Sequence, residues 1–336
     1  MNDSAAQLDP RVGEFLARER SSDLSSARLT KLAGDASNRL YFRVEPKEGE
    51  TRILALLPAP FDPAELPFLD VSELFEAIPL RVPRIHDVAS DLGILLLEDL
   101  GDLLLQNAVE RGCTEGRKNA LYRESVSMLV RLQARGAELS REARRFGPFR
   151  IAFDGKKFGD ELAFFRLHFL EGFSGRTLSA GDVGELDSEF RGLASELASQ
   201  PYALCHRDYH SRNLILCGDE IAVIDHQDAR MGPRCYDLAS LLNDSYVTHE
   251  APLVREMKDV FSRETGADVG AEYDVAALQR NLKALGTFGY QISARGNDVY
   301  RRYVSHTLAL VRANLEANPR WDSLRSALAK HLPELR

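Results

Sequence analysis

Three polar side chains in the second half of the chain have the types and the spacing that phosphoryl transfer requires. A stretch of the form H-R-D-x-x-x-x-N runs from His206 to Asn213, and Asp225 follows twelve residues later. An aspartate in this setting can accept the proton of an attacking hydroxyl group, and an asparagine with a second aspartate can hold the Mg²⁺ that bridges the phosphates of ATP. We therefore predict Asp208 as the catalytic base and Asn213 and Asp225 as metal ligands.

Other polar residues surround this motif, and their types alone allow more than one role. A loop aspartate most often caps a turn or a helix, but the register of Asp208 with its neighbours favours the catalytic role. We expect His206 to brace the loop by hydrogen bonding, and Asp237 either to brace the same loop or to cap the helix that it heads. Five neighbours are candidates for contact with substrate or phosphate, with an ordinary surface position as the alternative for each: His210, Arg212, Gln227, Asp228 and Arg230.

Short apolar runs on both sides of the motif predict the elements that must position it. Residues 214–216 and 221–224 are apolar and are typical of short strands, so the polar residues fall on turns at strand ends. Rigid strands can hold such turns against a cleft. Helical patterns follow, and they predict helices at 237–242 and, further along, at 251–265, 273–294, 298–318 and 322–332.

The N-terminal hundred residues predict a small β-rich lobe. A helix at 10–20 precedes strands at 27–32 and 40–44, which flank a cluster of turn-forming residues at 33–38. Such a hairpin can cover phosphates with its backbone N–H groups, although an ordinary hairpin connection is an open alternative. Further elements are expected here as strands at 53–57, 82–88 and 93–98 and a helix at 63–77.

The strand expected at 53–57 lacks a residue that kinases usually carry. A lysine on this strand normally pairs with the phosphates of ATP, but the nearest basic residues, Lys47 and Arg52, precede the strand. Glu73 and Glu76 could be the helix carboxylates that pair with such a lysine, or solvated surface residues. From Leu103 onward the pattern turns helical, and we place the boundary between the lobes near Leu100.

The helical part carries an aromatic stripe at helical spacing. Phe158, Leu162, Phe165 and Phe169 follow one another at intervals of four, three and four residues. This period predicts a helix face buried in a core, in preference to a ligand cage.

Composition limits the class of protein. With 336 residues the chain exceeds the size that one core usually serves. Hydrophobic residues make up 44% and charged residues 28%, as in ordinary globular proteins. A net charge of −8 argues against nucleic acid or an anionic membrane as partner, and no obligate protein partner is evident. The sequence predicts no signal peptide and has no run of the ~18 apolar residues that span a bilayer. The four scattered cysteines suggest reduced thiols. We therefore expect a cytosolic protein.

Several stretches together resemble the aminoglycoside phosphotransferase family, whose fold is kinase-like. Within that family the chain looks most like the bacterial cell-wall amino-sugar kinases, which phosphorylate the anomeric hydroxyl of N-acetylmuramate and N-acetylglucosamine. The matching stretches are 34–43, 95–102, 206–214 and 224–242, with a weaker match at 280–288.

The resemblance implies an α+β, two-lobe fold, with a nucleotide-binding lobe at 1–100 and a helical catalytic and substrate lobe at 101–336. It implies ATP and Mg²⁺ as cofactors, Asp208 as base, and Asn213 with Asp225 as metal ligands. The phosphate-covering loop would consist of Gly34, Asp35, Ala36, Ser37, Asn38 and Arg39, and the adenine edge would meet the backbone of Glu98, Asp99 and Leu100.

Two departures qualify the resemblance. The absent strand lysine is shared with the sugar-kinase subgroup, and we hypothesise that Arg39 or Arg43 supplies the missing charge, since a guanidinium binds phosphate oxygens in a bidentate way. His226 stands where an aromatic residue is expected.

The predicted function is phosphorylation of an amino-sugar hydroxyl to the sugar 1-phosphate, in peptidoglycan recycling. The alternatives are a kinase for aminoglycosides or another small molecule, and a nucleotide-binding protein without activity.

Overall fold

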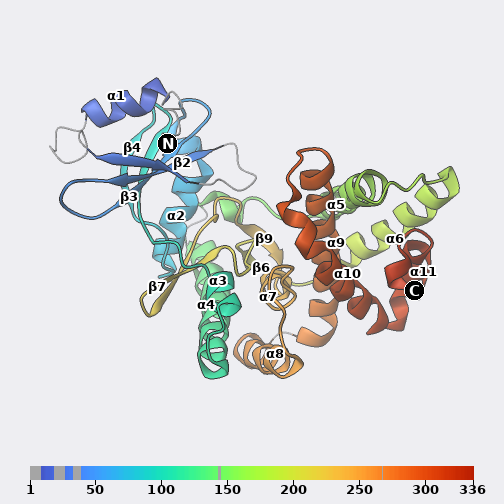
Figure 1. Ribbon diagram of the computed structural model, residues 1–336. Coiled ribbons are helices and arrows are strands. Elements are labelled where there is room, and N and C mark those ends of the chain that lie inside the picture. The colour runs from blue at the N-terminus through green and yellow to red at the C-terminus, as the bar shows by residue number, and fades with distance from the viewer. Residues whose placement is uncertain (1–8, 19–26, 33–38, 143–144, 267) are drawn as a thin grey trace.

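The protein consists of a small β-rich lobe and a larger helical lobe, seen in a computed structural model that describes residues 9–18, 27–32, 39–142, 145–266 and 268–336. In Figure 1 the blue N-terminal sheet lies at one end of the molecule and the red C-terminal helices lie at the other. Within the described ranges, no helix is both long and apolar enough to span a membrane.

The small lobe is built on one antiparallel sheet of five strands. Its strand order is β1-β2-β3-β5-β4, so β3 lies at the centre and β1 and β4 lie at the edges. In register, Leu54 of β3 faces Phe42 of β2 and Leu96 of β5. The bounds are β1 Arg28–Lys31, β2 Leu40–Glu45, β3 Arg52–Leu56, β4 Ile85–Ala89 and β5 Ile94–Glu98.

Both faces of this sheet are covered by a helix, which explains why its central strands are apolar on both sides. Alternate residues of a strand point to opposite faces. Leu54 packs in one cluster with Val12 and Phe15 of α1 (Pro10–Arg18). Ala55 packs in another with Phe68 of α2 (Pro67–Ala77).

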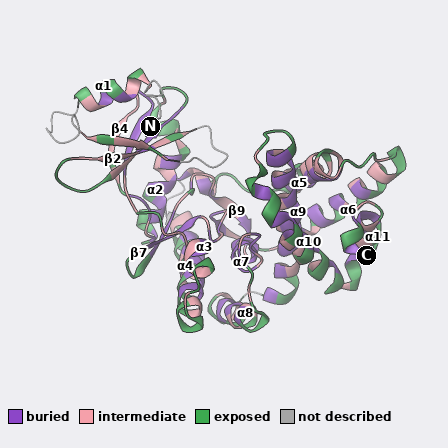
Figure 2. Ribbon diagram, in the orientation of Figure 1, coloured by how far each residue is buried: buried purple, intermediate pink, exposed green. Residues whose placement is uncertain are grey.

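The larger lobe surrounds one extensive hydrophobic core. The predicted stripe from Phe158 to Phe169 is buried in it, as Figure 2 illustrates for the purple inner faces of the helices. The helices are α3 Leu105–Glu110, α4 Glu115–Glu142, α5 Gly155–Phe165, α6 Ala180–Ala198, α7 Tyr236–Leu242, α8 Ala251–Thr265, α9 Val269–Ser293, α10 Arg301–Glu316 and α11 Asp322–Ala329. Short 3₁₀ turns occur at Pro63–Glu65, Gly147–Phe149, Asp298–Tyr300, Pro319–Trp321 and Pro333–Leu335.

Helix α9 approaches its neighbours unusually closely because of two glycines. A Cβ atom at Gly286 would lie 2.8 Å from the Cα of Phe165, and one at Gly289 would lie 2.3 Å from the carbonyl oxygen of His168. His168 belongs to a π-helical segment, Arg166–Phe173, that continues directly from α5. The two glycines therefore fix how deeply α9 packs into the lobe.

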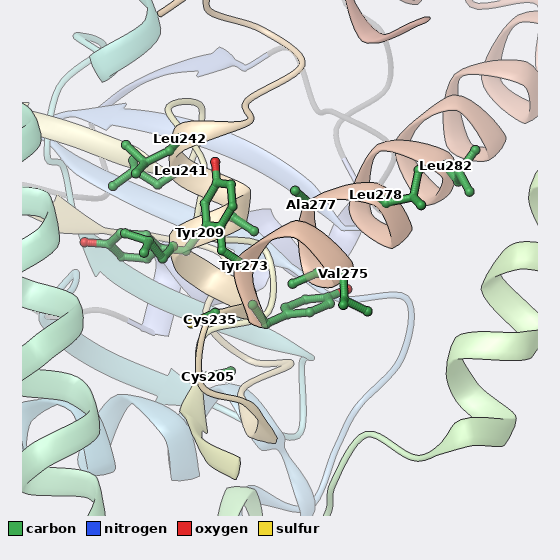
Figure 3. Close-up of a cluster of buried hydrophobic side chains, with 14 of the residues drawn as sticks. Cys205, Tyr209, Cys235, Leu241, Leu242, Tyr273, Val275, Ala277, Leu278 and Leu282 are labelled. Atoms are coloured by element: carbon green, nitrogen blue, oxygen red, sulfur yellow. The ribbon is translucent and has the colours of Figure 1, made fainter. Parts of the chain in front are cut away.

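Figure 3 shows how the core ties α9 to the region of the motif. Tyr209 comes from the stretch that contains the H-R-D motif, Leu241 and Leu242 from α7, and Ala277 and Leu278 from α9. All five are buried in the same hydrophobic cluster. Helix α9 is therefore buried on several sides within the larger lobe.

The predicted α+β class is confirmed, and most predicted elements lie within a few residues of the observed ones. Two predictions were wrong in detail. The helix expected at 63–77 is interrupted at Leu66, where the chain is extended before Pro67, as proline disfavours a helical residue before it. The strand expected at 82–88 begins at Ile85.

Candidate active site

Two small β-ladders carry the motif. Strand β6 (Tyr202–Cys205) pairs with β9 (Arg230–Pro233), and β7 (Leu214–Cys217) pairs with β8 (Glu220–Val223). The H-R-D-x-x-x-x-N stretch forms the loop between β6 and β7, and Asp225 follows β8. The backbone N–H of Ile224 donates to the carbonyl oxygen of Asn213 at 3.0 Å. This bond holds Asn213 and Asp225 next to each other.

Asp237 holds the backbone of this loop by two hydrogen bonds. Its carboxylate accepts hydrogen bonds from the backbone N–H groups of His206 at 2.6 Å and Arg207 at 2.9 Å. Arg207 has a φ of +87°, a conformation that side chains with a Cβ seldom adopt. The imidazole of His206 bonds the carbonyl oxygen of Ile224 at 3.0 Å, and Tyr209 donates to the carbonyl oxygen of Ser125 in α4 at 2.9 Å. The loop is thus fixed on three sides.

Asp208 is surrounded by cations. Its Oδ1 lies 2.9 Å from the Nζ of Lys283 and 3.3 Å from a guanidinium nitrogen of Arg280, and its Oδ2 lies 3.8 Å from Arg207. Burial opposes the charged carboxylate, but these cations outweigh it and hold the pKa of Asp208 well below its usual range. Asp208 is therefore ionised at neutral pH, the state that a proton acceptor requires.

Asn213 and Asp225 offer the ligands that Mg²⁺ prefers. The amide nitrogen of Asn213 donates to the carbonyl oxygen of Asp208 at 2.8 Å, which leaves its amide oxygen for another partner. Asp225 is exposed, has a φ of +59°, and accepts at Oδ1 from Gln227 at 2.8 Å. Mg²⁺ takes few protein ligands and completes its octahedron with water and phosphate oxygens, so this pair fits the ion. In the described part of the chain, no group of three or more His, Cys, Asp or Glu residues forms a closed metal cage.

A cavity of about 110 Å³ opens beside Asp208 between α9 and the segment that starts in α7. Its wall combines aromatic rings with hydroxyl, amide and charged groups. His210 packs edge-on against Tyr246 at 5.2 Å, and burial lowers the pKa of His210 to about 3, so its imidazole is neutral there. The cavity is lined by Asp208, His210, Ser240, Asn243, Asp244, Ser245, Tyr246, Arg280, Asn281, Lys283, Ala284, Thr287 and Phe288.

The five predicted substrate residues are divided by the structure into two groups. His210 lines the cavity, and Arg212 lies over the Tyr246 ring at 4.7 Å. The others have local partners. Asp228 pairs with Arg207 at 2.8 Å and with Arg230 at 3.3 Å, whereas Gln227 holds Asp225.

Five of the predicted nucleotide-binding residues lie outside the described residues: Gly34, Asp35, Ala36, Ser37 and Asn38. Arg39 lies over the Phe68 ring at 5.8 Å. The Phe68 ring also packs against His226, the residue that follows Asp225, at 4.8 Å. Burial, with His206 and Arg39 nearby, lowers the pKa of His226 to about 3.

Arg43, by contrast, is held by two carboxylates. Its guanidinium pairs with Asp99 at 2.6 Å and with Asp102 at 2.8 Å. The side chain of Glu98 is likewise paired, with Arg81 at 2.5 Å. Arg43 thus has two carboxylate partners in this structure, and the hypothesis that Arg39 or Arg43 binds phosphate stays a prediction.

Arg280 and Lys283 were not predicted as site residues from the sequence. They were part of a stretch that only resembled the family, and they lie 72 and 75 residues from Asp208. The available signal was two cations three residues apart in a predicted helix, which lie on one face because of the helical period.

The chain belongs to the phosphotransferase enzyme family (APH), whose match covers residues 28–273. An N-acetylmuramate/N-acetylglucosamine kinase of Neisseria meningitidis is 31% identical over 302 residues, which cover 84% of this chain and 84% of that protein. A kinase of the same description from Pseudomonas aeruginosa is 28% identical over 97% of this chain and 95% of its own. Among solved structures, an ADP-bound aminoglycoside phosphotransferase superposes with a TM-score of 0.61 at 15% identity, covering 90% of this chain and 98% of that one. The predicted family and kinase-like fold are confirmed.

Proposed function

We propose that the protein transfers the γ-phosphoryl group of ATP, with Mg²⁺, to the anomeric hydroxyl of N-acetylmuramate, N-acetylglucosamine or both. The observation that carries this proposal is the position of Asp208, an ionised carboxylate on the wall of a polar and aromatic cavity. The product is a sugar 1-phosphate, as required for the recycling of cell-wall sugars. ATP is a cytoplasmic substrate, so we place the reaction there.

In this proposal Asp208 orients the acceptor hydroxyl and takes its proton as the oxygen attacks phosphorus. Asn213 and Asp225 hold the metal ion, which when bound neutralises charge on the phosphates. The bracing of the loop by Asp237 keeps the carboxylate in place. Most of the rate enhancement would come from positioning and charge neutralisation.

The electrostatics of the base support an anomeric acceptor. Three cations near Asp208 stabilise its charged form, so the carboxylate is a weak base. The anomeric hydroxyl is more acidic than the other hydroxyls of a sugar, because the ring oxygen withdraws electron density from its carbon. A weak base is therefore better matched to this hydroxyl than to the others.

On the nucleotide side, we propose that residues 34–39 cover the phosphates, with Arg39 supplying a guanidinium, and that the backbone of residues 98–100 meets adenine. The location of Arg39 over the Phe68 ring, which packs against the residue that follows Asp225, supports the first assignment. Arg43 ties β2 to the segment that follows β5 and acts indirectly.

The rival substrate is a polycationic aminoglycoside. Such a ligand needs a cavity dominated by carboxylates, whereas Lys283 and Arg280 line this cavity together with Asp208 and Asp244. The mixed charge favours a neutral or anionic sugar.

The test is a comparison of ATP consumption with N-acetylmuramate, N-acetylglucosamine and kanamycin, followed by phosphorus NMR of the product. We expect turnover of the N-acetyl sugars and a 1-phosphate signal. Preference for kanamycin, or phosphate on another carbon, would refute the proposal. Asp208→Asn should lower kcat by about 10²–10⁴-fold, and a fully active variant would contradict the assignment of the base.

A further inference from the structure

Lys283 is the cation nearest to the proposed base, and it comes from a distant element. It lies in the middle of α9, and its Nζ is 2.9 Å from Oδ1 of Asp208. Its side chain is only 17% exposed, and it lines the same cavity as Asp208. The depth of α9, set by Gly286 and Gly289, brings it there.

Both arginines beside Asp208 also contact other groups, whereas Lys283 forms an ion pair with Asp208. Arg280 donates to the carbonyl oxygen of Arg207 at 3.0 Å and lies over the ring of Tyr236. Arg207 pairs with Asp228 at 2.8 Å. Among the described residues, Asp208 is the one carboxylate within ion-pair distance of Lys283. An ammonium group has three N–H donors, and a single carboxylate oxygen does not use them all.

The burial of Lys283 has a cost that one ion pair does not fully explain. Removing a lysine from water is costly even beside a carboxylate, and Asp208 also has Arg280 and Arg207 within ion-pair distance, although Arg207 is shared with Asp228. Strand β3, Arg52–Leu56, contains no lysine that could reach the phosphates from the other lobe. The N–H donors of Lys283 that Asp208 does not use are therefore suited to an anion that arrives with the reaction.

We propose that Lys283 is a catalytic residue that contacts the transferred phosphoryl group and supplies, from the helical lobe, positive charge that β3 does not provide. This inference rests on the proposed function, because it takes Asp208 as the base of a phosphoryl transfer.

The chemistry follows from the shared position of the two side chains. The acceptor oxygen forms a bond to phosphorus while the bond from phosphorus to the nucleoside diphosphate breaks, and its electron pair leaves with the diphosphate. The hydroxyl proton passes to Asp208. Once Asp208 gains this proton it attracts Lys283 less, so the ammonium group, which keeps its own protons, can turn to the phosphoryl oxygens. Such charge stabilisation acts mainly in the transition state.

The first experiment compares Lys283→Met, which keeps the length of the side chain, with Lys283→Arg, which keeps the charge. Lys156→Met in α5, whose side chain is 81% exposed, is the matched control. The variants are assayed on any acceptor that the unaltered protein phosphorylates. We expect Lys283→Met to lower kcat by about 10²–10³-fold, to change KM for ATP far less, and to be partly rescued in Lys283→Arg. The control should behave as the unaltered protein.

The second experiment does not depend on turnover. Aluminium fluoride with ADP and Mg²⁺ mimics the planar phosphoryl group, and its binding is measured by calorimetry beside that of ADP alone. Lys283→Met should weaken the fluoride complex by about 10²-fold and leave ADP binding unchanged. Equal weakening of both ligands, or an unchanged kcat, would show a structural role and overturn the inference. If no amino sugar is phosphorylated but the fluoride complex still depends on Lys283, the proposed substrate fails and this inference stands.

Discussion

The Nε of Arg43 in β2 lies 2.6 Å from the carboxylate of Asp99, the residue that follows β5. Arg43 is 18% exposed and Asp99 only 5%. The same guanidinium reaches Asp102 with two nitrogens at 2.8 Å. Together these carboxylates raise the pKa of Arg43, so the side chain stays charged. The ion pairs of Arg43 thus connect β2 of the small lobe to the segment that leads into the helical lobe.

Substitution of Arg43 should therefore mainly affect stability, whereas substitution of Arg39 should mainly affect the KM for ATP. Arg43→Met leaves the buried carboxylate of Asp99 without its cation, which should lower the free energy of unfolding by about 3 kcal/mol. Arg39→Ala should raise KM for ATP with little loss of stability. Chemical denaturation and steady-state kinetics of both variants separate the two effects. A stable Arg43→Met with a raised KM for ATP would return the phosphate role to Arg43.

Asp237 should be required for both stability and turnover. Asp237→Ala leaves the backbone N–H groups of His206 and Arg207 without an acceptor, at a cost of about 1–3 kcal/mol. The strained backbone of Arg207 should relax, so kcat should fall even at temperatures where the variant is folded. Asp259→Ala, at an exposed position on α8, is the control and should change stability by no more than about 0.5 kcal/mol. Equal stability of the two variants would contradict this role of Asp237.

The loop and the ladder of this site could be predicted because the residues that form them are close together in the sequence. The spacing of Asp208, Asn213 and Asp225 encodes a loop and a ladder that are close in sequence, and apolar periodicity locates the strands and helices around them. The family match also covers this stretch.

The unpredicted features depend on packing between distant elements. Lys283 reaches Asp208 only because α9 packs deeply against Phe165 and His168, and no local pattern reveals that depth. The partners of Arg43 also come from another strand end, 56 and 59 residues away. The π-helical segment Arg166–Phe173 has the same apolar spacing as an ordinary helix, so the sequence pattern could not distinguish them.

His249 should make the stability of the protein depend on pH. Burial, with the Lys118 cation nearby, lowers the pKa of His249 to about 4, while its ring packs against Tyr122 and bonds the carbonyl oxygen of Leu241. Below pH 6.5 the unfolded chain binds a proton that the folded chain refuses. The free energy of unfolding should therefore fall as the pH is lowered from 6.5 towards 4, by up to about 1.4 kcal/mol per pH unit.

Urea denaturation of the unaltered protein and of His249→Gln at pH 8 and pH 5 measures this contribution. The variant should lose less stability between these two pH values, by about 2 kcal/mol at most. Other buried histidines titrate alike in both proteins and cancel in the comparison. Identical losses would mean that His249 accepts its proton in the folded state.

A single methyl group added at Gly286 should disturb the site through the position of α9. The Cβ of alanine would lie 2.8 Å from the Cα and 2.9 Å from the backbone nitrogen of Phe165, and backbone atoms cannot give way as a side chain can. Gly286→Ala should lower the free energy of unfolding by about 1–3 kcal/mol. It should also lower kcat, because Lys283 lies one turn away and moves with the helix. Gly192→Ala in α6 is the matched control, since its Cβ meets no atom within 4 Å, and it should stabilise the protein by about 0.5–1 kcal/mol. A Gly286→Ala variant that is as stable and as active as the Gly192→Ala control would show that the close approach of α9 does not position Lys283.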